Sequence, residues 1–211
     1  FLIPSVFLNF LRFVFFLKRK EYKATFILEG GIEILLPRTK FPFFLSKMGR
    51  KKIFNSYIFI AERPTHEALL RKIVYELLSS GYVNKNDSLI DIGCWIGDSC
   101  LVWSKMLSNG KVFAIEGLNE SLNFAKELAK INDIENIKFI NAICSDKPLL
   151  PMESSGFSSG TSFVESAFDS SLKSTTIDEV IPIEFHHSIG LFHIDVEGQE
   201  EKVIYGSKRV I

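Results

Sequence analysis

The stretch that decides the fold is Leu89-Ile90-Asp91-Ile92-Gly93-Cys94-Trp95-Ile96-Gly97-Asp98. Its first residues are apolar around one carboxylate, which is typical of a buried strand, and two glycines then predict a turn before a helix. The next apolar run, Val112-Phe113-Ala114-Ile115-Glu116, predicts a second buried strand that ends in an acid. Open α/β sheets hold an adenosine at such a strand, glycine turn and acid, so the sequence predicts a nucleoside cofactor.

The residues of this turn select among the nucleoside cofactors. A dinucleotide-binding turn needs glycine where Trp95 stands, so a pyrophosphate is disfavoured and a nicotinamide enzyme ranks last. Asp91 suits a cationic head group, and Glu116 can accept two hydrogen bonds from a ribose diol. These features fit S-adenosylmethionine. Gly93 and Gly97 are expected to let the main chain pass close to this ligand.

Alternating strand and helix patterns extend this unit into a sheet. Strands are predicted at 88–92, 111–115, 137–140 and 191–195. Helices are predicted from the Thr65 cap to Gly81, with Leu69, Ile73, Val74, Leu77 and Leu78 inside, over 98–107, and from Asn119 as the cap, with Leu122, Ala125, Leu128 and Ala129 inside. This order is typical of a doubly wound, mostly parallel α/β sheet with a Rossmann-like fold.

The ligand crevice of such a sheet lies at the carboxyl ends of its strands. Asp91, Glu116, Asn141 and Asp195 all fall at those ends. Their positions predict one shared site.

Five blocks of the sequence resemble, in the same order, the FkbM family of S-adenosylmethionine-dependent O-methyltransferases. They are Asp91–Asp98, Phe113–Glu116, Asn141–Asp146, Thr175–Glu179 and His193–Glu200. The resemblance implies a class I methyltransferase domain over 65–211 and methyl transfer to a hydroxyl of a sugar, glycan or secondary metabolite.

The same resemblance assigns further residues. Cys94, Trp95 and Asp98 would contact the cofactor with the rest of the turn, and Asn141 and Ala142 would line the adenine pocket. The chain departs from the family at three places. The family usually has Ala-Asn at Cys94-Trp95, Pro at Gly117 and Lys at His193.

An aliphatic hydroxyl is a poor nucleophile until a base takes its proton. The candidate bases are Asp195, Glu197 and His193. On a strand His193 and Asp195 share a face, and Asp195 ranks first because it lies nearer the strand end. Asp195 or Glu197 could instead cap the following helix, and His193 could be a core residue. Asp178 is expected to cap a short helical turn.

Composition excludes several classes of protein. The chain has 211 residues and a net charge of +0, which gives nucleic acid no support as a partner. Its three cysteines are odd in number and lack C-x-x-C spacing, so they are expected to be buried free thiols rather than a disulfide framework or a zinc site. The adjacent His186 and His187 would face opposite ways on a strand, and no metal is expected.

The N-terminal segment, residues 1–22, is an apolar run followed by Lys18-Arg19-Lys20. A spanning helix needs about 20 apolar residues, and Asn9 and Arg12 interrupt this run. The alternatives are a helix on a membrane surface, a helix docked on protein and an anchor cut short. The expected location is cytoplasmic, peripheral at or anchored to a membrane.

Residues 23–64 carry short β-type runs at 25–28, 32–36 and 57–60, with Gly30-Gly31 as a hairpin turn. They predict a small β-rich lead-in. The serine-rich stretch 151–173 is expected to be a substrate lid or a plain insertion. A sheet of this type needs further strands after Ile211, so the chain is expected to be a C-terminally truncated fragment.

Two other functions remain open at this stage. One is a Mg²⁺-dependent O-methyltransferase in which Asp195 and Glu197 hold the metal. The other is a noncatalytic, membrane-associated nucleoside-binding module. Activity that survives EDTA would exclude the first, and cofactor binding without methyl transfer would favour the second.

Overall fold

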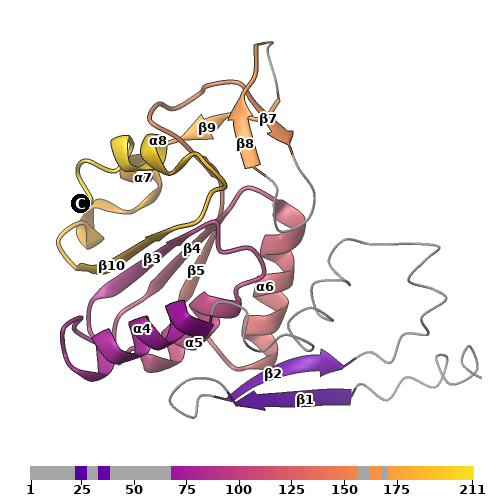
Figure 1. The fold of residues 1–211 in the computed structure, drawn as a ribbon, viewed down its shortest axis with the longest axis vertical. Coiled ribbons are helices and arrows are strands. Elements are labelled where there is room, and N and C mark those ends of the chain that lie inside the picture. The colour runs from indigo at the N-terminus through magenta and orange to yellow at the C-terminus, as the bar shows by residue number, and fades with distance from the viewer. Residues whose placement is uncertain (1–21, 28–32, 39–67, 156–161, 168–170) are drawn as a thin grey trace, which may run out of the picture.

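The computed structural model describes residues 22–27, 33–38, 68–155, 162–167 and 171–211 of the chain (Figure 1). The N-terminal helix predicted over residues 1–22 lies outside these ranges except for Tyr22, which begins strand β1 (Tyr22–Ile27). The predicted cap Thr65 and the β-type run at 57–60 also lie outside them. Within the described residues, no helix has both the length and the apolar character that a membrane crossing requires.

Four parallel strands form the central sheet. They are β3 (Ser88–Ile92), β4 (Val112–Glu116), β5 (Ile137–Asn141) and β10 (Ile189–Ile194), in the order β10-β3-β4-β5. Every residue of β3 and β4 is buried, because these central strands have both faces covered. The predicted doubly wound, mostly parallel sheet is confirmed.

Helices cover the two faces of this sheet unequally (Figure 1). One face carries three helices, α4 (Ala68–Ser79), α5 (Asp98–Met106) and α6 (Asn119–Ile131), which pack on Leu89, Val112 and Ala114. The other face carries α7 (Ile177–Val180), η3 (Ile183–Phe185) and α8 (Glu200–Tyr205), near Ile90, Ile92, Phe113 and Ile115. Successive side chains of a strand therefore point to opposite faces of the sheet and pack in two separate hydrophobic cores.

The helix patterns were predicted with two errors. Leu122, Ala125, Leu128 and Ala129 are buried in α6, as predicted, but Leu118 is its N-cap and Asn119 its first residue. In α4, Val74 and Leu78 are buried while Leu69 and Ile73 are 74% and 49% exposed. The buried face of α4 thus differs from the predicted one. It includes Arg71, which is only 3% exposed and pairs with Asp98 at 3.8 Å.

A second capping prediction was also wrong. Thr176 is the N-cap of α7, and Glu179 completes a capping box with it. Asp178 instead accepts a hydrogen bond from the backbone N–H of Arg209 at 2.9 Å.

Short strands surround the sheet. The hairpin predicted in the lead-in is present as β1 (Tyr22–Ile27) and β2 (Glu33–Arg38), although its Gly30-Gly31 turn lies outside the described residues. β6 (Ile143–Cys144) pairs with β9 (Ser174–Thr175). In the serine-rich stretch, β7 (Met152–Ser155) and β8 (Ser162–Glu165) form an antiparallel pair. The expected loop thus contains regular structure, because the ladder satisfies its backbone groups.

Candidate functional site

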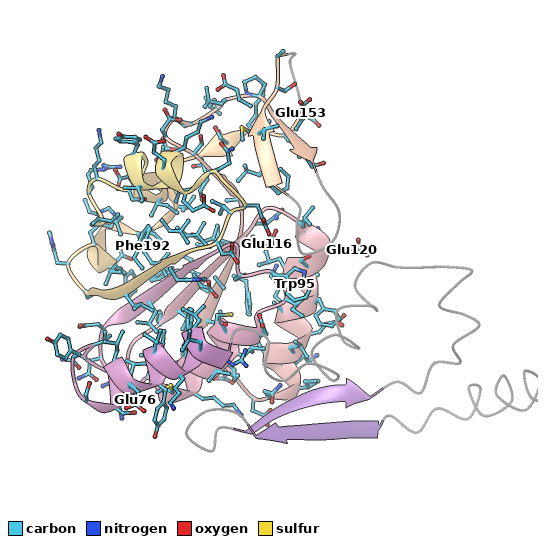
Figure 2. All side chains as sticks on the ribbon, in the orientation of Figure 1. Glu76, Trp95, Glu116, Glu120, Glu153 and Phe192 are labelled. Carbon is cyan, nitrogen blue, oxygen red and sulfur yellow. The ribbon has the colours of Figure 1, made fainter. Side chains whose placement is uncertain are left out.

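A pocket of about 210 Å³ opens at the carboxyl ends of the sheet strands. Figure 2 shows Glu116 and Trp95 at this end of the sheet. Most of the predicted site residues line the pocket: Asp91, Gly93, Cys94, Trp95, Asp98, Glu116, Ala142, His193, Asp195 and Glu197. Gly97 and Asn141 do not line it. The structure therefore brings together side chains from β3, β4 and β10 that lie far apart in the sequence.

Glu116 ends β4 with its carboxylate inside the pocket, and only 8% of the residue is exposed. One carboxylate oxygen accepts the backbone N–H of Trp95 at 3.0 Å, and the other accepts that of Leu118 at 2.7 Å. Burial nevertheless raises the pKa of Glu116 from 4.5 to about 7, against the lowering effect of these hydrogen bonds. Each oxygen keeps a second lone pair that a ribose hydroxyl can use.

The two glycines of the turn are required by protein packing rather than by the ligand alone. Gly93 has φ +83°, and a Cβ there would collide with the carbonyl of Asp195, whose carbon would lie 2.8 Å away. Gly97 has φ +82°, and its Cβ would lie 3.0 Å from the Cβ of Ala125 in α6. Both positions need a left-handed backbone, which glycine adopts without strain. The close passage predicted beside the ligand is thus partly a passage beside β10 and α6.

Trp95 stands where a dinucleotide turn has its second glycine. Its φ is +46°, a left-handed value that is costly for a residue with a side chain. The backbone nonetheless holds this conformation, since its N–H is fixed by Glu116. Trp95 thus lines the pocket at the turn position where a dinucleotide site keeps a glycine for the pyrophosphate.

Asp91 lies at the floor of the pocket and is 2% exposed. His193 Nδ1 lies 2.8 Å from Asp91 Oδ1, and β10 and β3 are paired at these two residues. An ionised carboxylate only accepts, so Nδ1 donates and the basic lone pair of the imidazole lies on Nε2. The ring of Trp103 packs edge-on against His193 at 5.5 Å between centroids. Two neighbours therefore orient the imidazole.

Asp195 and Glu197 follow β10, and both side chains are exposed at the pocket. Neither caps the turn before α8. Glu200 does so, because its carboxylate accepts the backbone N–H groups of Val196 at 3.2 Å and Gly198 at 3.0 Å. The Gly198 hydrogen bond is the main cause that lowers the pKa of Glu200. The capping role considered for Asp195 and Glu197 therefore belongs to Glu200, a residue that the sequence did not indicate for it.

Asn141 does not line the pocket but contacts the backbone of residues that do. Its side-chain amide donates to the carbonyl of Glu116 at 2.7 Å and to that of Gly117 at 3.0 Å. These bonds tie the end of β5 to the loop after β4 and so set the direction of that loop. Ala142, the next residue, lines the pocket itself.

Sequence reasoning missed several residues of the pocket wall, among them Leu118, Ile143 and Phe163. Leu118 is predictable in hindsight, because it lies two residues beyond Glu116. Phe163 belongs to β8, and no motif in its serine-rich surroundings points to the pocket. Only the folded chain places it there.

Among the residues with described positions, no group of three or more His, Cys, Asp and Glu side chains is placed to hold a metal ion. Cys94, Cys100 and Cys144 are free and buried, as predicted. The hydrogen bond with the Cys100 thiol, and then burial, raise the pKa of Cys94, so it stays a neutral thiol beside the pocket.

Comparison with solved structures finds S-adenosylmethionine-dependent methyltransferases. One from Aquifex aeolicus is 25% identical, with a TM-score of 0.32, and the match covers 37% of this chain and 42% of that protein. Precorrin-6y C5,15-methyltransferase from Geobacter metallireducens GS-15 is 22% identical, with a TM-score of 0.31, and 36% and 39% are covered. Coclaurine N-methyltransferase bound to N-methylheliamine and S-adenosylhomocysteine is 17% identical, with a TM-score of 0.30, and 33% and 21% are covered.

The chain thus spans less than half of the length of each of these proteins, and likenesses at such scores decide nothing about function. No curated protein matches the chain. A family comparison is informative, however, because the methyltransferase FkbM domain matches residues 91–211, which is more than half of the chain. The chain therefore belongs to the FkbM methyltransferase family, whose cofactor is S-adenosylmethionine.

Proposed function

We propose that this chain binds S-adenosylmethionine in the pocket and transfers its methyl group to a hydroxyl of a sugar, glycan or secondary metabolite. The observation that carries the proposal is that the buried Glu116 carboxylate, the turn after β3 and three candidate bases line one pocket. Both carboxylate oxygens of Glu116 are held by backbone N–H groups, so the acid is oriented before a ligand arrives.

The strand order supports one direction for the cofactor. Glu116 on β4 would bind the ribose, in the middle of the pocket. Two carboxylates, those of Asp91 and Asp195, lie on one side of it, at the ends of β3 and β10. A cationic sulfonium and an amino acid are stabilised there. The methionine part of the cofactor would therefore lie toward β10 and the adenine toward β5.

The reaction is a displacement at the methyl carbon. The acceptor oxygen forms a bond to that carbon while the carbon–sulfur bond breaks, and S-adenosylhomocysteine leaves with the electron pair on sulfur. The hydroxyl proton passes to a base on the enzyme. Among the candidate bases, Asp195 ranks first by its position at the strand end, and Glu197 lies two residues further on. The contact of His193 with Asp91 supports His193 as the base, because the carboxylate orients the imidazole ring, as a general base requires.

The acceptor class and the membrane contact have different support. A hydroxyl acceptor is what the family resemblance implies, and the exposed Asp195 and Glu197 give a polar rim that suits a sugar. Contact with a membrane surface through residues 1–20 rests on the sequence alone. Sedimentation with anionic vesicles tests it, and a chain that stays in the supernatant contradicts it.

Calorimetric titration of S-adenosylhomocysteine into the full chain tests the central claim. We expect binding that weakens at least about tenfold in Glu116→Ala, a loss of about 1.4 kcal/mol. Glu120→Ala is the matched control, because Glu120 is an exposed acid in the first turn of α6 (Figure 2). A folded chain that does not bind the ligand overturns the proposal.

A further inference from the structure

The β7–β8 hairpin brings one aromatic ring to the pocket from outside the methyltransferase motifs. Phe163 of β8 lines the pocket together with Gly117 and Leu118. A Cβ on Gly117 would overlap this ring, with Cδ2 and Cζ of Phe163 both at 2.9 Å. The ring therefore lies directly on the backbone that follows Glu116.

Backbone hydrogen bonds and one buried side chain hold the base of the hairpin together. Ser166 donates its backbone N–H to the carbonyl of Pro151 at 2.8 Å, and Met152 donates to that of Leu172 at 2.9 Å. Met152 is only 2% exposed. β7 and β8 then pair from Met152 with Glu165 to Ser155 with Ser162. Phe163 is thus positioned by the pairing of β7 with β8 and by the buried Met152 side chain at the base of the hairpin.

The residue at position 117 fits this arrangement. Glycine, which has no Cβ, stands at this position. A proline ring at that place would occupy the space that the Phe163 ring fills, because even a Cβ is too close. The glycine and the aromatic ring are therefore complementary features of the same wall.

The wall around Phe163 differs in chemistry from the rest of the pocket. On the β5 side of Glu116 the lining residues are Leu118, Ala142, Ile143 and Phe163, and none of them is charged. A ribose held by Glu116, with its sulfonium side toward β3 and β10, directs the base to this apolar side. Adenine has flat faces that pack well on aromatic rings and poorly in water.

We propose that Phe163 packs against the adenine of the cofactor, so that the β7–β8 hairpin is a cofactor-binding element. This inference rests on the proposed function. It replaces the expectation of a substrate lid for the described part of this stretch with a contact to the base. Nothing in the family motifs assigns a role to this residue.

Titration of S-adenosylhomocysteine and of adenosine into the full chain and into Phe163→Ala tests the contact. We expect both ligands to bind about tenfold more weakly to the variant, near the low end of base–aromatic stacking. Phe163→Tyr keeps the ring and should restore affinity. Val164→Ala is the matched control, because Val164 is the next residue of β8 and points to the other face. Circular dichroism and thermal unfolding verify that the variants fold.

A double-mutant cycle with Gly117→Ala gives a second readout. That methyl group displaces the ring, so Gly117→Ala alone should weaken binding, while in the Phe163→Ala background it should cost little more. Additive losses would contradict the proposal, and so would a loss for S-adenosylhomocysteine that adenosine does not show. If the wild-type chain binds and folded Phe163→Ala binds equally well, only this inference fails. If the folded wild-type chain binds neither ligand, the proposed function fails with it.

Discussion

At the β3 and β10 end of the pocket, polar side chains lie on strands that pair directly, with Asp91 and His193 opposite each other in register. At the β5 end, apolar side chains come from a loop, a short strand and a distant hairpin, as Leu118, Ile143 and Phe163. The first end is built by neighbouring strands of one parallel sheet. The second end depends on how an insertion packs back on the sheet.

The two ends of the pocket differ in what brings their residues together. At the polar end the pairing of strand backbones is enough, and at the apolar end side-chain packing is also needed. A parallel ladder forces residues at strand ends together once the register is set, whatever their side chains are. An insertion reaches the pocket only if its own anchors hold. Mutations at the polar end should therefore act on chemistry and on folding, and those at the apolar end on affinity.

The largest effect is expected at His193. His193→Ala removes the proposed base and should slow methyl transfer by about 10²- to 10⁴-fold, with little change in S-adenosylhomocysteine affinity. The rate of S-adenosylhomocysteine formation, measured over a panel of glycans and hydroxyl compounds, checks this. Added imidazole should restore part of the rate. Asp91→Asn should also slow transfer, since it disturbs the orienting contact.

The same assay can contradict the assignment of His193 as the base. A full rate in His193→Ala, together with a comparable loss in Asp195→Asn or Glu197→Gln, would move the base to the exposed acids of the β10 end. The comparison between the ends would survive, but the role of the imidazole would not.

Gly93→Ala should have the next largest effect, because a Cβ there meets the Asp195 carbonyl at a φ of +83°. We expect a loss of about 2–4 kcal/mol in the free energy of unfolding, measured with urea. Gly198→Ala is the control. Its φ is +93° but its Cβ would meet nothing within 4 Å, so only backbone strain of about 1 kcal/mol is expected. Equal losses would show that close packing at Gly93 is unimportant.

Glu116 should make cofactor binding depend on pH. Its pKa is about 7 in the ligand-free protein, and the ribose hydroxyls favour the ionised form. The dissociation constant of S-adenosylhomocysteine should therefore rise by up to about tenfold for each pH unit below 7. Titrations between pH 5 and 8 check this, since the pH range brackets the raised pKa. In Glu116→Gln the dependence should vanish, and an unchanged slope would assign it to another group.

The same group should affect the stability of the ligand-free protein. The pKa of Glu116 is raised on folding from 4.5 to about 7, so the folded state binds the proton more tightly than the unfolded state. Its contribution to the free energy of unfolding is fully present below pH 4.5 and is lost as pH rises through about 7. Urea unfolding of wild type and Glu116→Gln over this range measures the difference, which should change only between these two pH values.

The smallest effect is expected at Asn141. Asn141→Ala removes two hydrogen bonds to the loop after β4 and should cost about 1 kcal/mol of S-adenosylhomocysteine affinity, or about fivefold. Asn109→Ala is the control, because the Asn109 side chain bonds to Asn86 far from the pocket. Equal affinities in both variants would contradict the role of Asn141 in directing the loop.

Local pattern was enough to predict the sheet and most of the pocket. The apolar runs that end in Asp91 and Glu116 define two parallel strands, and the ends of such strands must meet at one edge. Capping was predicted less well. Asn119 and Asp178 have the right chemistry for a cap, but Leu118 and Thr176 hold those positions, because the cap depends on where the chain enters the helix.

By itself the sequence determined the family, the cofactor and the row of polar residues along the strand ends, because these follow from short motifs with a fixed period. Only the tertiary structure decided the partners of those residues. The imidazole of His193 lies on Asp91 because β10 pairs with β3, and Phe163 reaches the pocket because the β7–β8 hairpin folds over Gly117. Contacts between distant segments depend on packing of the whole domain, which no local pattern encodes.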